Sequence, residues 1–191
     1  MITRDAEPCR LSLRGISIRR DRSTRSINEL INLLVEKLEK NEGRKLMIAI
    51  GSDHGGFALK EQLRAYYKDE LKDFGAYNDV RGIDEPQTAI AVGEAVARGE
   101  VDAGILICRS GVGMTIAANK VPGVRAALCY SDETAKSAKE HNNANVITLG
   151  ADYINLEQAI KIIELWKDSK FLDGIYQERL DIVQKYELER K

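Results

Sequence analysis

The sequence predicts an α/β protein: a three-layer αβα sandwich with a Rossmann-like, five-stranded parallel sheet and helices on both faces. Three observations favour this fold. Short apolar runs alternate with amphipathic runs along residues 47–191, glycine-rich or polar turns separate them, and the alternation occurs five times in succession. Repeated strand–helix–strand units of this kind build parallel sheets whose faces are covered by helices.

The expected strands are the short apolar runs, and the expected helices are the segments whose apolar residues recur every three or four positions. The strands cover residues 47–51, 71–77, 103–108, 124–129 and 145–149. The helices cover residues 57–68, 88–97, 112–119, 132–140, 156–167 and 176–186. In such sheets, ligands bind beyond the carboxyl ends of the strands, near the point where the strand order reverses.

Residues 1–46 differ from the rest of the chain in charge. They carry 11 Lys and Arg against 7 Asp and Glu, which leaves a net charge of −5 on residues 47–191. Within them, residues 26–40 have an apolar stripe at helical spacing and predict one amphipathic helix. We therefore expect a basic N-terminal extension over residues 1–46, outside a domain formed by residues 47–191. An alternative is that translation starts at Met47.

The composition is typical of a globular protein and argues against several other classes. Hydrophobic residues make up 43% of the 191 positions and charged residues 31%. The acidic main body disfavours a nucleic-acid partner, and no apolar run approaches the ~20 residues of a membrane span. Three cysteines without C-x-x-C spacing disfavour a disulfide framework. With no signal-peptide pattern at the N-terminus, we expect a cytoplasmic protein.

The segment GILICRSGVGMTIAANK places Cys108 at the carboxyl end of a strand, followed by a glycine-rich turn and a helix. The N–H groups at the start of a helix favour a thiolate and any anion bound beside it. One turn would therefore supply a nucleophile or base together with an anion hole. Two alternatives remain open. Cys108 is a buried structural cysteine, or Gly111-x-Gly113 with Asp132 forms a dinucleotide fingerprint.

The loop GSDHGG follows the first strand and places Asp53 next to His54. An adjacent acid and imidazole can move protons to and from a sugar oxygen, or hold a phosphate. The alternative is that Asp53 only caps the helix that follows.

The loop EHNNAN, before the last strand, contains His141, the second of only two histidines in the chain. We expect both histidine loops to lie at the same edge of the sheet as Cys108. Two histidines without ligand spacing do not make a coordination set, so no metal site is expected.

Taken in order, these motifs resemble the ribose-5-phosphate isomerase type B / galactose-6-phosphate isomerase (RpiB/LacAB) family over about residues 47–186. The matching segments are GSDHGGFALKEQL, GEVDAGILICRSGVGMTIAANKVPGVRAAL and AKEHNNANVITLG. The resemblance implies a sugar-phosphate aldose–ketose isomerase that works through an enediolate without a cofactor, with ribose 5-phosphate and ribulose 5-phosphate as the leading pair. It also implies a homodimer or homotetramer whose active sites are shared between chains, with no nucleic-acid or membrane partner.

The same resemblance implies roles for individual residues. Cys108 would move the proton between C1 and C2, and His141, helped by Asp53, would open the sugar ring. The catalytic residues it implies are Cys108, His141, Ser110 and Asp53. The substrate-binding residues it implies are Asp53, His54, Arg109, Ser110, Gly111, Val112, Gly113, Asn142 and Arg179.

Five positions depart from the family pattern, and one of them is Glu85, which stands ahead of Pro86 where the family has a tyrosine. Arg109 stands where the family commonly has glycine, Asp152 stands where it has arginine, and Ile175–Tyr176 replace an Arg-His pair. Arginine grips phosphate bidentately, so Arg109 either contacts the substrate anion or points to solvent. The alternatives to the leading function are therefore a divergent sugar-phosphate-binding homologue, an inactive partner subunit, or an isomerase for a four- or six-carbon sugar phosphate.

Overall fold

The computed structural model describes Glu29 and residues 46–80 and 85–189, and within them five strands form one all-parallel sheet in the order β2-β1-β3-β5-β4. The strands are β1 (Ile48–Ser52), β2 (Leu71–Asp73), β3 (Ala103–Cys108), β4 (Ala126–Leu128) and β5 (Val146–Gly150). The helices are α2 (Phe57–Tyr67), α3 (Glu85–Ala97), α4 (Val112–Ala118), α5 (Asp132–Glu140), α6 (Leu156–Asp168) and α7 (Ile175–Glu189), with a 3₁₀ turn, η1, at Lys68–Glu70.

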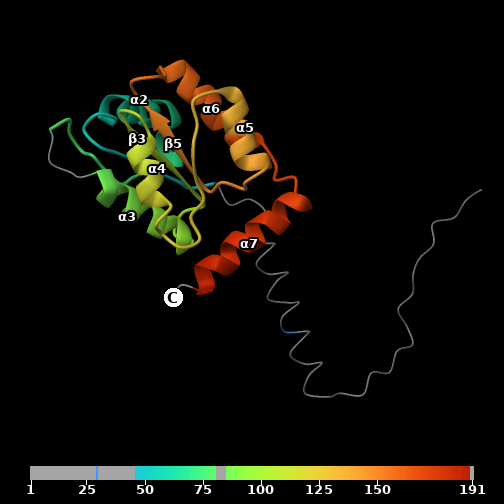
Figure 1. Cartoon of the computed structure of the whole chain (residues 1–191). Coiled ribbons are helices and arrows are strands. Elements are labelled where there is room, and N and C mark those ends of the chain that lie inside the picture. Colours follow the sequence, from blue (N-terminus) through green and yellow to red (C-terminus); the bar gives the residue numbers. More distant parts are fainter. Residues whose placement is uncertain (1–28, 30–45, 81–84, 190–191) are drawn as a thin grey trace, which may run out of the picture. The chain divides into compact units, whose positions relative to one another are not determined.

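Helices cover both faces of the sheet, which confirms the predicted three-layer sandwich. Figure 1 shows α3 and α4 on one side of the strands and α5 and α6 on the other. Successive residues of β3 enter two separate cores: Ile105 and Ile107 pack with α2, α5 and α6, whereas Leu106 and Cys108 pack with α3 and α4. A strand buried on both faces is apolar without alternation, as the sequence of β3 is.

The predicted element bounds agree closely with the structure, except that two strands are shorter: β2, and β4, which covers Ala126–Leu128 rather than residues 124–129. β3 and α5 begin and end at the predicted residues, while β2 ends at Asp73 rather than at residue 77. Gly75 follows with φ +101°, a conformation that a regular strand does not contain. No helix among the described residues has the length and apolarity that crossing a bilayer demands.

Residues 45–191 form a unit of their own, separate from residues 1–44. The predicted helix over residues 26–40 lies outside the described residues, apart from Glu29, which is helical and exposed. The character of residues 1–46 therefore stays a prediction.

The turn between β1 and α2 rests directly on β3. Asp53 N–H donates to the carbonyl of Ile107 at 3.2 Å, and a Cβ added at Gly56 would lie 2.3 Å from the same oxygen. Gly56 has an ordinary φ of −92°, so the position requires glycine because there is no room for a side chain, not because of the backbone conformation. The absent side chain lets the Asp53 loop lie against the end of the strand that carries Cys108.

Replacing Gly56 with alanine should therefore lower the free energy of unfolding by about 3 kcal/mol, because the backbone of Ile107 cannot yield to the new methyl group. Urea unfolding measures the change. Gly99→Ala is the matched control: its Cβ meets no atom within 4 Å, and its φ of +68° alone should lose about 1 kcal/mol. Equal losses in the two variants would contradict the steric explanation.

Candidate active site

The loops after β1 and β3 diverge at the point where the strand order reverses. β1 lies between β2 and β3, and the chain leaves β1 for α2 on one face but leaves β3 for α4 on the other. This is the arrangement at which α/β sheets bind ligands, beyond the carboxyl ends of the strands. Asp53 and Cys108 both lie there, one at the end of each strand.

The Cys108 thiol is enclosed by the turn that follows it. Its side chain is only 2% exposed, and the Gly111 N–H donates to its Sγ at 3.1 Å. The N–H of Val112 is directed to Ser110 Oγ at 3.3 Å. The N–H groups at the start of α4 are predicted to face a ligand, but those of Gly111 and Val112 have partners within the turn. Those of Gly113 and Met114 belong to the first turn of α4, where no helical acceptor exists.

Gly111 is required by both its conformation and its surroundings. Its φ is +80°, and an added Cβ would lie 2.5 Å from Leu128 Cδ1 and 3.1 Å from the carbonyl carbon of Leu149. Because Gly111 adopts the left-handed conformation, the chain turns sharply and the Gly111 N–H points at the sulfur of Cys108. The donor at Cys108 therefore depends on a glycine.

Asp53 is buried, with 6% of its surface exposed, and its Oδ1 accepts the N–H of Gly56 at 2.9 Å. This bond secures the turn before α2, but it does not cap the helix as the alternative proposed, because Gly56 is itself the N-cap residue and α2 has no side-chain cap. Oδ2 takes no hydrogen bond from the part of the chain that the structure describes. One carboxylate oxygen is thus structural, while the other remains available for chemistry. His54, which follows it, is half-buried.

Arg109 does not extend freely into solvent, although its side chain is 70% exposed. Its Nε donates to Asp152 Oδ2 at 3.0 Å, and the backbone of Asp152 donates to the Arg109 carbonyl at the same distance. The carboxylate raises the pKa of the Arg109 guanidinium, chiefly through this hydrogen bond. Arg109 and Asp152, two of the departures from the family pattern, are therefore partners of each other.

The expectation that His141 shares the edge of Cys108 is wrong. In the parallel register of β3 and β5, Cys108 lies opposite Gly150 and Gly104 lies opposite Val146. His141 precedes Val146, so it lies at the amino edge of the sheet. The length of β5, five residues or roughly 15 Å, separates this loop from the carboxyl edge.

At the amino edge, His141 belongs to a second cluster of polar and aromatic groups. Its ring stacks on Tyr176 with centroids 4.5 Å apart and an interplanar angle of 12°, and its Nδ1 lies 3.2 Å from Ser137 Oγ. The guanidinium carbon of Arg179 lies 5.6 Å from the centre of the same Tyr176 ring. Asn142 donates to the Ser137 carbonyl at 3.0 Å. Tyr176, a departure from the family pattern, thus connects His141 to Arg179.

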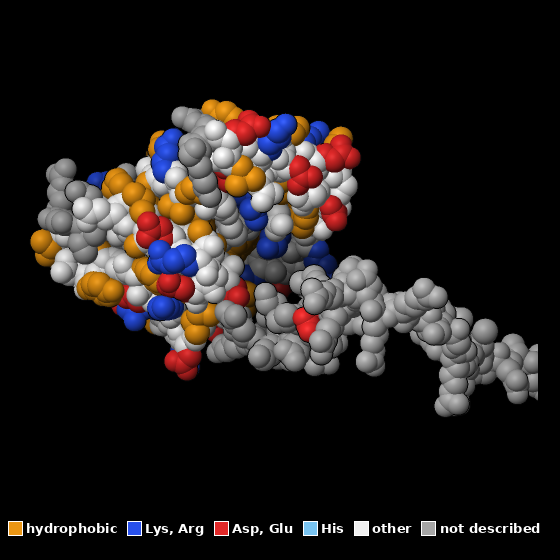
Figure 2. All heavy atoms as spheres, turned by 90° about the horizontal axis from the view of Figure 1, so that it is seen from below, with side chains coloured by type: hydrophobic (Ala, Val, Ile, Leu, Met, Phe, Trp, Pro, Cys, Tyr) orange, Lys and Arg blue, Asp and Glu red, His pale blue; other side chains and the backbone are white. Residues whose placement is uncertain are grey.

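Arg125, which the sequence analysis did not single out, holds the loop that carries His141. Its Nε donates to the Asn143 carbonyl at 2.9 Å, and its backbone N–H donates to Asn145 Oδ1 at 2.8 Å. Burial lowers the pKa of its guanidinium. Figure 2, a view of the amino edge, shows Lys and Arg side chains gathered near the middle of this face. A hollow there is lined by Gly123, Arg125, Asn143, Gln177, Leu180, Val183, Gln184 and Glu187.

The candidate residues therefore form two groups at opposite edges. Those at the carboxyl edge are Asp53, His54, Cys108, Arg109, Ser110, Gly111, Val112 and Gly113. Those at the amino edge are His141, Asn142 and Arg179. The sequence signal for Ser137 is its spacing of four from His141, the residue that follows α5, whereas nothing local indicates Arg125 or the pairing of Arg109 with Asp152. Within the described residues, no cluster of three His, Cys, Asp or Glu could hold a metal ion.

The fold is that of a doubly wound α/β protein, and the cysteine turn lies at the carboxyl edge of its sheet. The chain matches the family model described as ribose/galactose isomerase over residues 48–183 and belongs to that family. It is an aldose–ketose isomerase.

Relatives of known name support this assignment. Ribose-5-phosphate isomerase B of Escherichia coli is 40% identical over 146 residues, which cover 75% of this chain and 97% of that protein. D-erythrulose-4-phosphate isomerase of Pectobacterium atrosepticum is 37% identical, covering 76% and 98%. The solved structure of Clostridium thermocellum ribose-5-phosphate isomerase B superposes with a TM-score of 0.74 at 39% identity, covering 76% of this chain and all of that one.

Substitutions at Asp53 should separate the effect of its hydrogen bond to Gly56 from the effect of its charge. Asp53→Asn keeps an oxygen that accepts the Gly56 N–H, so the free energy of unfolding should fall by no more than about 0.5 kcal/mol. Asp53→Ala removes the acceptor and should lower it by about 1 kcal/mol. Thermal unfolding of the two variants measures the difference. A larger loss for the asparagine variant would contradict the structural role of Oδ1.

Proposed function

We propose that this protein interconverts ribose 5-phosphate and ribulose 5-phosphate, with Cys108 as the base. The observation that carries the proposal is the Cys108 thiol at the end of β3, with the Gly111 N–H 3.1 Å from its sulfur, in a chain of the isomerase family. A backbone donor and the start of a helix both favour the thiolate, the form that removes a proton.

The reaction needs a base and a site for negative charge. In the open-chain aldose, the Cys108 thiolate takes the proton from C2, and the electrons of that bond form the C1–C2 double bond while charge develops on O1. The N–H groups at the start of α4 and the Ser110 hydroxyl stabilise this oxyanion. Preorganised donors of this kind lower such barriers by roughly 3–4 kcal/mol each. The Cys108 thiol then returns the proton to C1, and the proton of O2 passes to O1, which gives the ketose and regenerates the thiolate.

Ring opening precedes this step and takes one proton from the anomeric hydroxyl while another reaches the ring oxygen. His141, with Asp53, is the acid–base pair that we assign to it, because an imidazole changes charge near neutral pH. His54, Asn142 and Arg179 contact the substrate, together with the Gly113 N–H, since the N–H groups of Gly111 and Val112 have partners within the turn.

The positions of these groups favour a site shared by two copies of the chain. His141 and Cys108 lie at opposite edges of one sheet, so a His141 that acts on the sugar held at Cys108 must come from another copy. Two side chains of α4, Val112 and Ile116, are exposed beside the cysteine turn, and α7 has no buried residue although it carries Ile182 and Val183. Exposed apolar residues of this kind mark protein interfaces. We propose a homodimer or homotetramer with shared sites.

A second candidate function is the isomerisation of a four-carbon sugar phosphate. It is favoured by the 37% identity to D-erythrulose-4-phosphate isomerase, which is close to the 40% identity to ribose-5-phosphate isomerase B. Assays with four-, five- and six-carbon sugar phosphates distinguish these substrates. Sugar-phosphate binding without turnover would instead favour a divergent, non-catalytic homologue.

Cys108→Ala should reduce kcat/KM for ribose 5-phosphate by about 10²- to 10⁴-fold, since it removes the base. Cys129→Ala is the matched control, because Cys129 is also buried and burial raises the pKa of its thiol to about 12. The conversion to ribulose 5-phosphate is followed directly in each variant. Full activity of Cys108→Ala would contradict the mechanism.

Mixing two inactive variants tests the shared site. Cys108→Ala and His141→Ala, unfolded together and refolded as a mixture, should regain about a quarter of the activity of the unaltered protein, since half of the dimers are hybrids with one intact site of two. Each variant refolded alone should stay inactive. If the mixture also stays inactive while hybrid dimers are detected by mass, His141 does not act on the partner's sugar.

A further inference from the structure

Arg109 is the single Lys or Arg in four of the loops at the carboxyl edge. These loops follow β1, β3, β4 and β5 and comprise residues 53–56, 109–111, 129–131 and 151–155. They also hold two carboxylates, those of Asp53 and Asp152. A phosphate dianion that approaches Cys108 along these loops meets an otherwise acidic edge with one guanidinium.

Two contacts fix this guanidinium over the turn between β1 and α2. Asp152 binds its Nε at 3.0 Å, and a Cβ added at Gly55 would lie 2.4 Å from Arg109 Cγ, so the aliphatic stem lies on that glycine. Its two terminal nitrogens make no hydrogen bond to any described residue. They form a planar pair of donors whose spacing matches two phosphate oxygens.

The charges around Arg109 set how strongly it can attract an anion. Asp152 orients the guanidinium and at the same time opposes the approach of a phosphate with its own negative charge. Asp53 attracts Arg109 more weakly than Asp152 does, and its negative charge likewise opposes the approach of a phosphate. The affinity of the pair for phosphate should therefore rise when the charge of Asp152 is removed but its hydrogen bond is kept.

We propose that Arg109 binds the phosphate group of the substrate and that Asp152 is the residue that positions it. The inference rests on the proposed function for the identity of the substrate as a sugar phosphate. It goes further by naming Arg109 as the residue that binds the phosphate group and Asp152 as the residue that sets the affinity of this binding. An arginine held at one nitrogen loses less conformational freedom when it binds a phosphate with the other two.

Inorganic phosphate is the probe, and its dissociation constant is measured by isothermal titration calorimetry on the full chain. Arg109→Gln should weaken phosphate binding about tenfold, because a charge-assisted pair of hydrogen bonds is lost. Asp152→Asn should tighten it about threefold, since the amide oxygen still accepts the Nε–H and the opposing charge is gone. The two variants of one ion pair thus shift the affinity in opposite directions.

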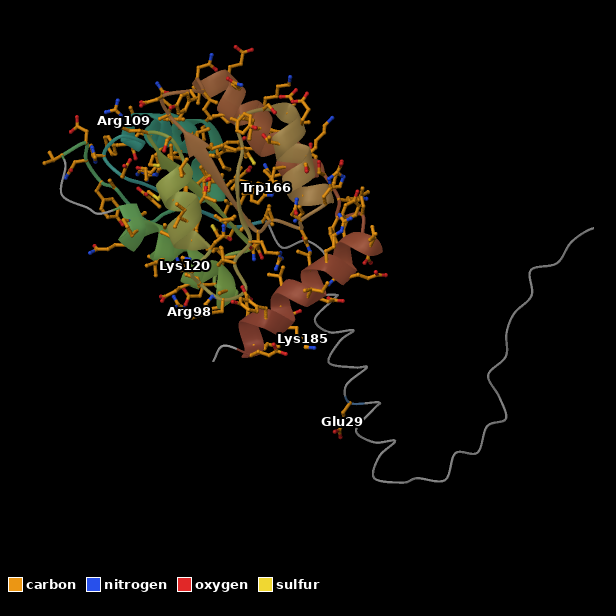
Figure 3. All side chains as sticks on the ribbon, viewed as in Figure 1. Glu29, Arg98, Arg109, Lys120, Trp166 and Lys185 are labelled. Carbon is orange, nitrogen blue, oxygen red and sulfur yellow. The ribbon has the colours of Figure 1, made fainter. Side chains whose placement is uncertain are left out.

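Two controls separate phosphate binding from general damage. Arg98→Gln should leave the dissociation constant unchanged, because Arg98 is an exposed arginine paired with Glu94 and Glu100 at the other end of the sheet from Arg109 (Figure 3). Gly55→Ala should weaken phosphate binding with no change of charge, since the new methyl group displaces the Arg109 stem. It also serves as the second variant if Arg109→Gln fails to fold.

With the sugar phosphate itself, Arg109→Gln should raise KM about tenfold and change kcat less than twofold, because the phosphate contact is the same in the ground and transition states. Phosphate affinity unaltered by Arg109→Gln would overturn the proposal. If Arg109→Gln and Asp152→Asn weakened phosphate binding equally, the proposal would also be overturned, since the ion pair would then only stabilise the structure. Phosphate binding that depends on Arg109, in a protein that turns over no sugar phosphate, would contradict the proposed function alone.

Discussion

The register of β1, β3 and β5 decides which side chains this molecule can bring together. Ser52 lies opposite Ile107, and Cys108 lies opposite Gly150, so the loops that follow these three strands start at nearly the same level. Residues separated by about a hundred positions in the chain thereby become neighbours at one edge. The same register carries the loop before β5 to the far edge, because every strand of a parallel sheet runs in one direction.

Local signals in the sequence were sufficient for the fold and for most element boundaries. β3 is a continuous apolar run that ends at a glycine-rich turn, and α5 starts after Ser131, whose side chain caps the helix through Thr134. Each of these boundaries depends on a few adjacent residues. The strand predicted over residues 71–77 is longer than β2, since the half-buried residues of β2 carry a weaker pattern and the conformation of Gly75 depends on the packing around it.

The site was less predictable because its interactions link distant segments. In the sequence, Asp152 only replaces an arginine of the family pattern, yet in the folded chain it binds an arginine 43 positions away. The ring of Tyr176 likewise meets that of His141 only once α7 lies beside the end of α5. The edge occupied by His141 followed from topology alone, since a loop that precedes a parallel strand lies at its amino end. The motif that resembled the family did not carry that information.

The exposed apolar residues of α7, and the distance between the two edges of the sheet, have a consequence for how the enzyme behaves in solution. If each working site combines groups from two chains, a single folded chain contains all the residues of the site and still has no complete one. Specific activity then depends on protein concentration, and dilution below the dissociation constant of the assembly removes catalysis without unfolding any domain.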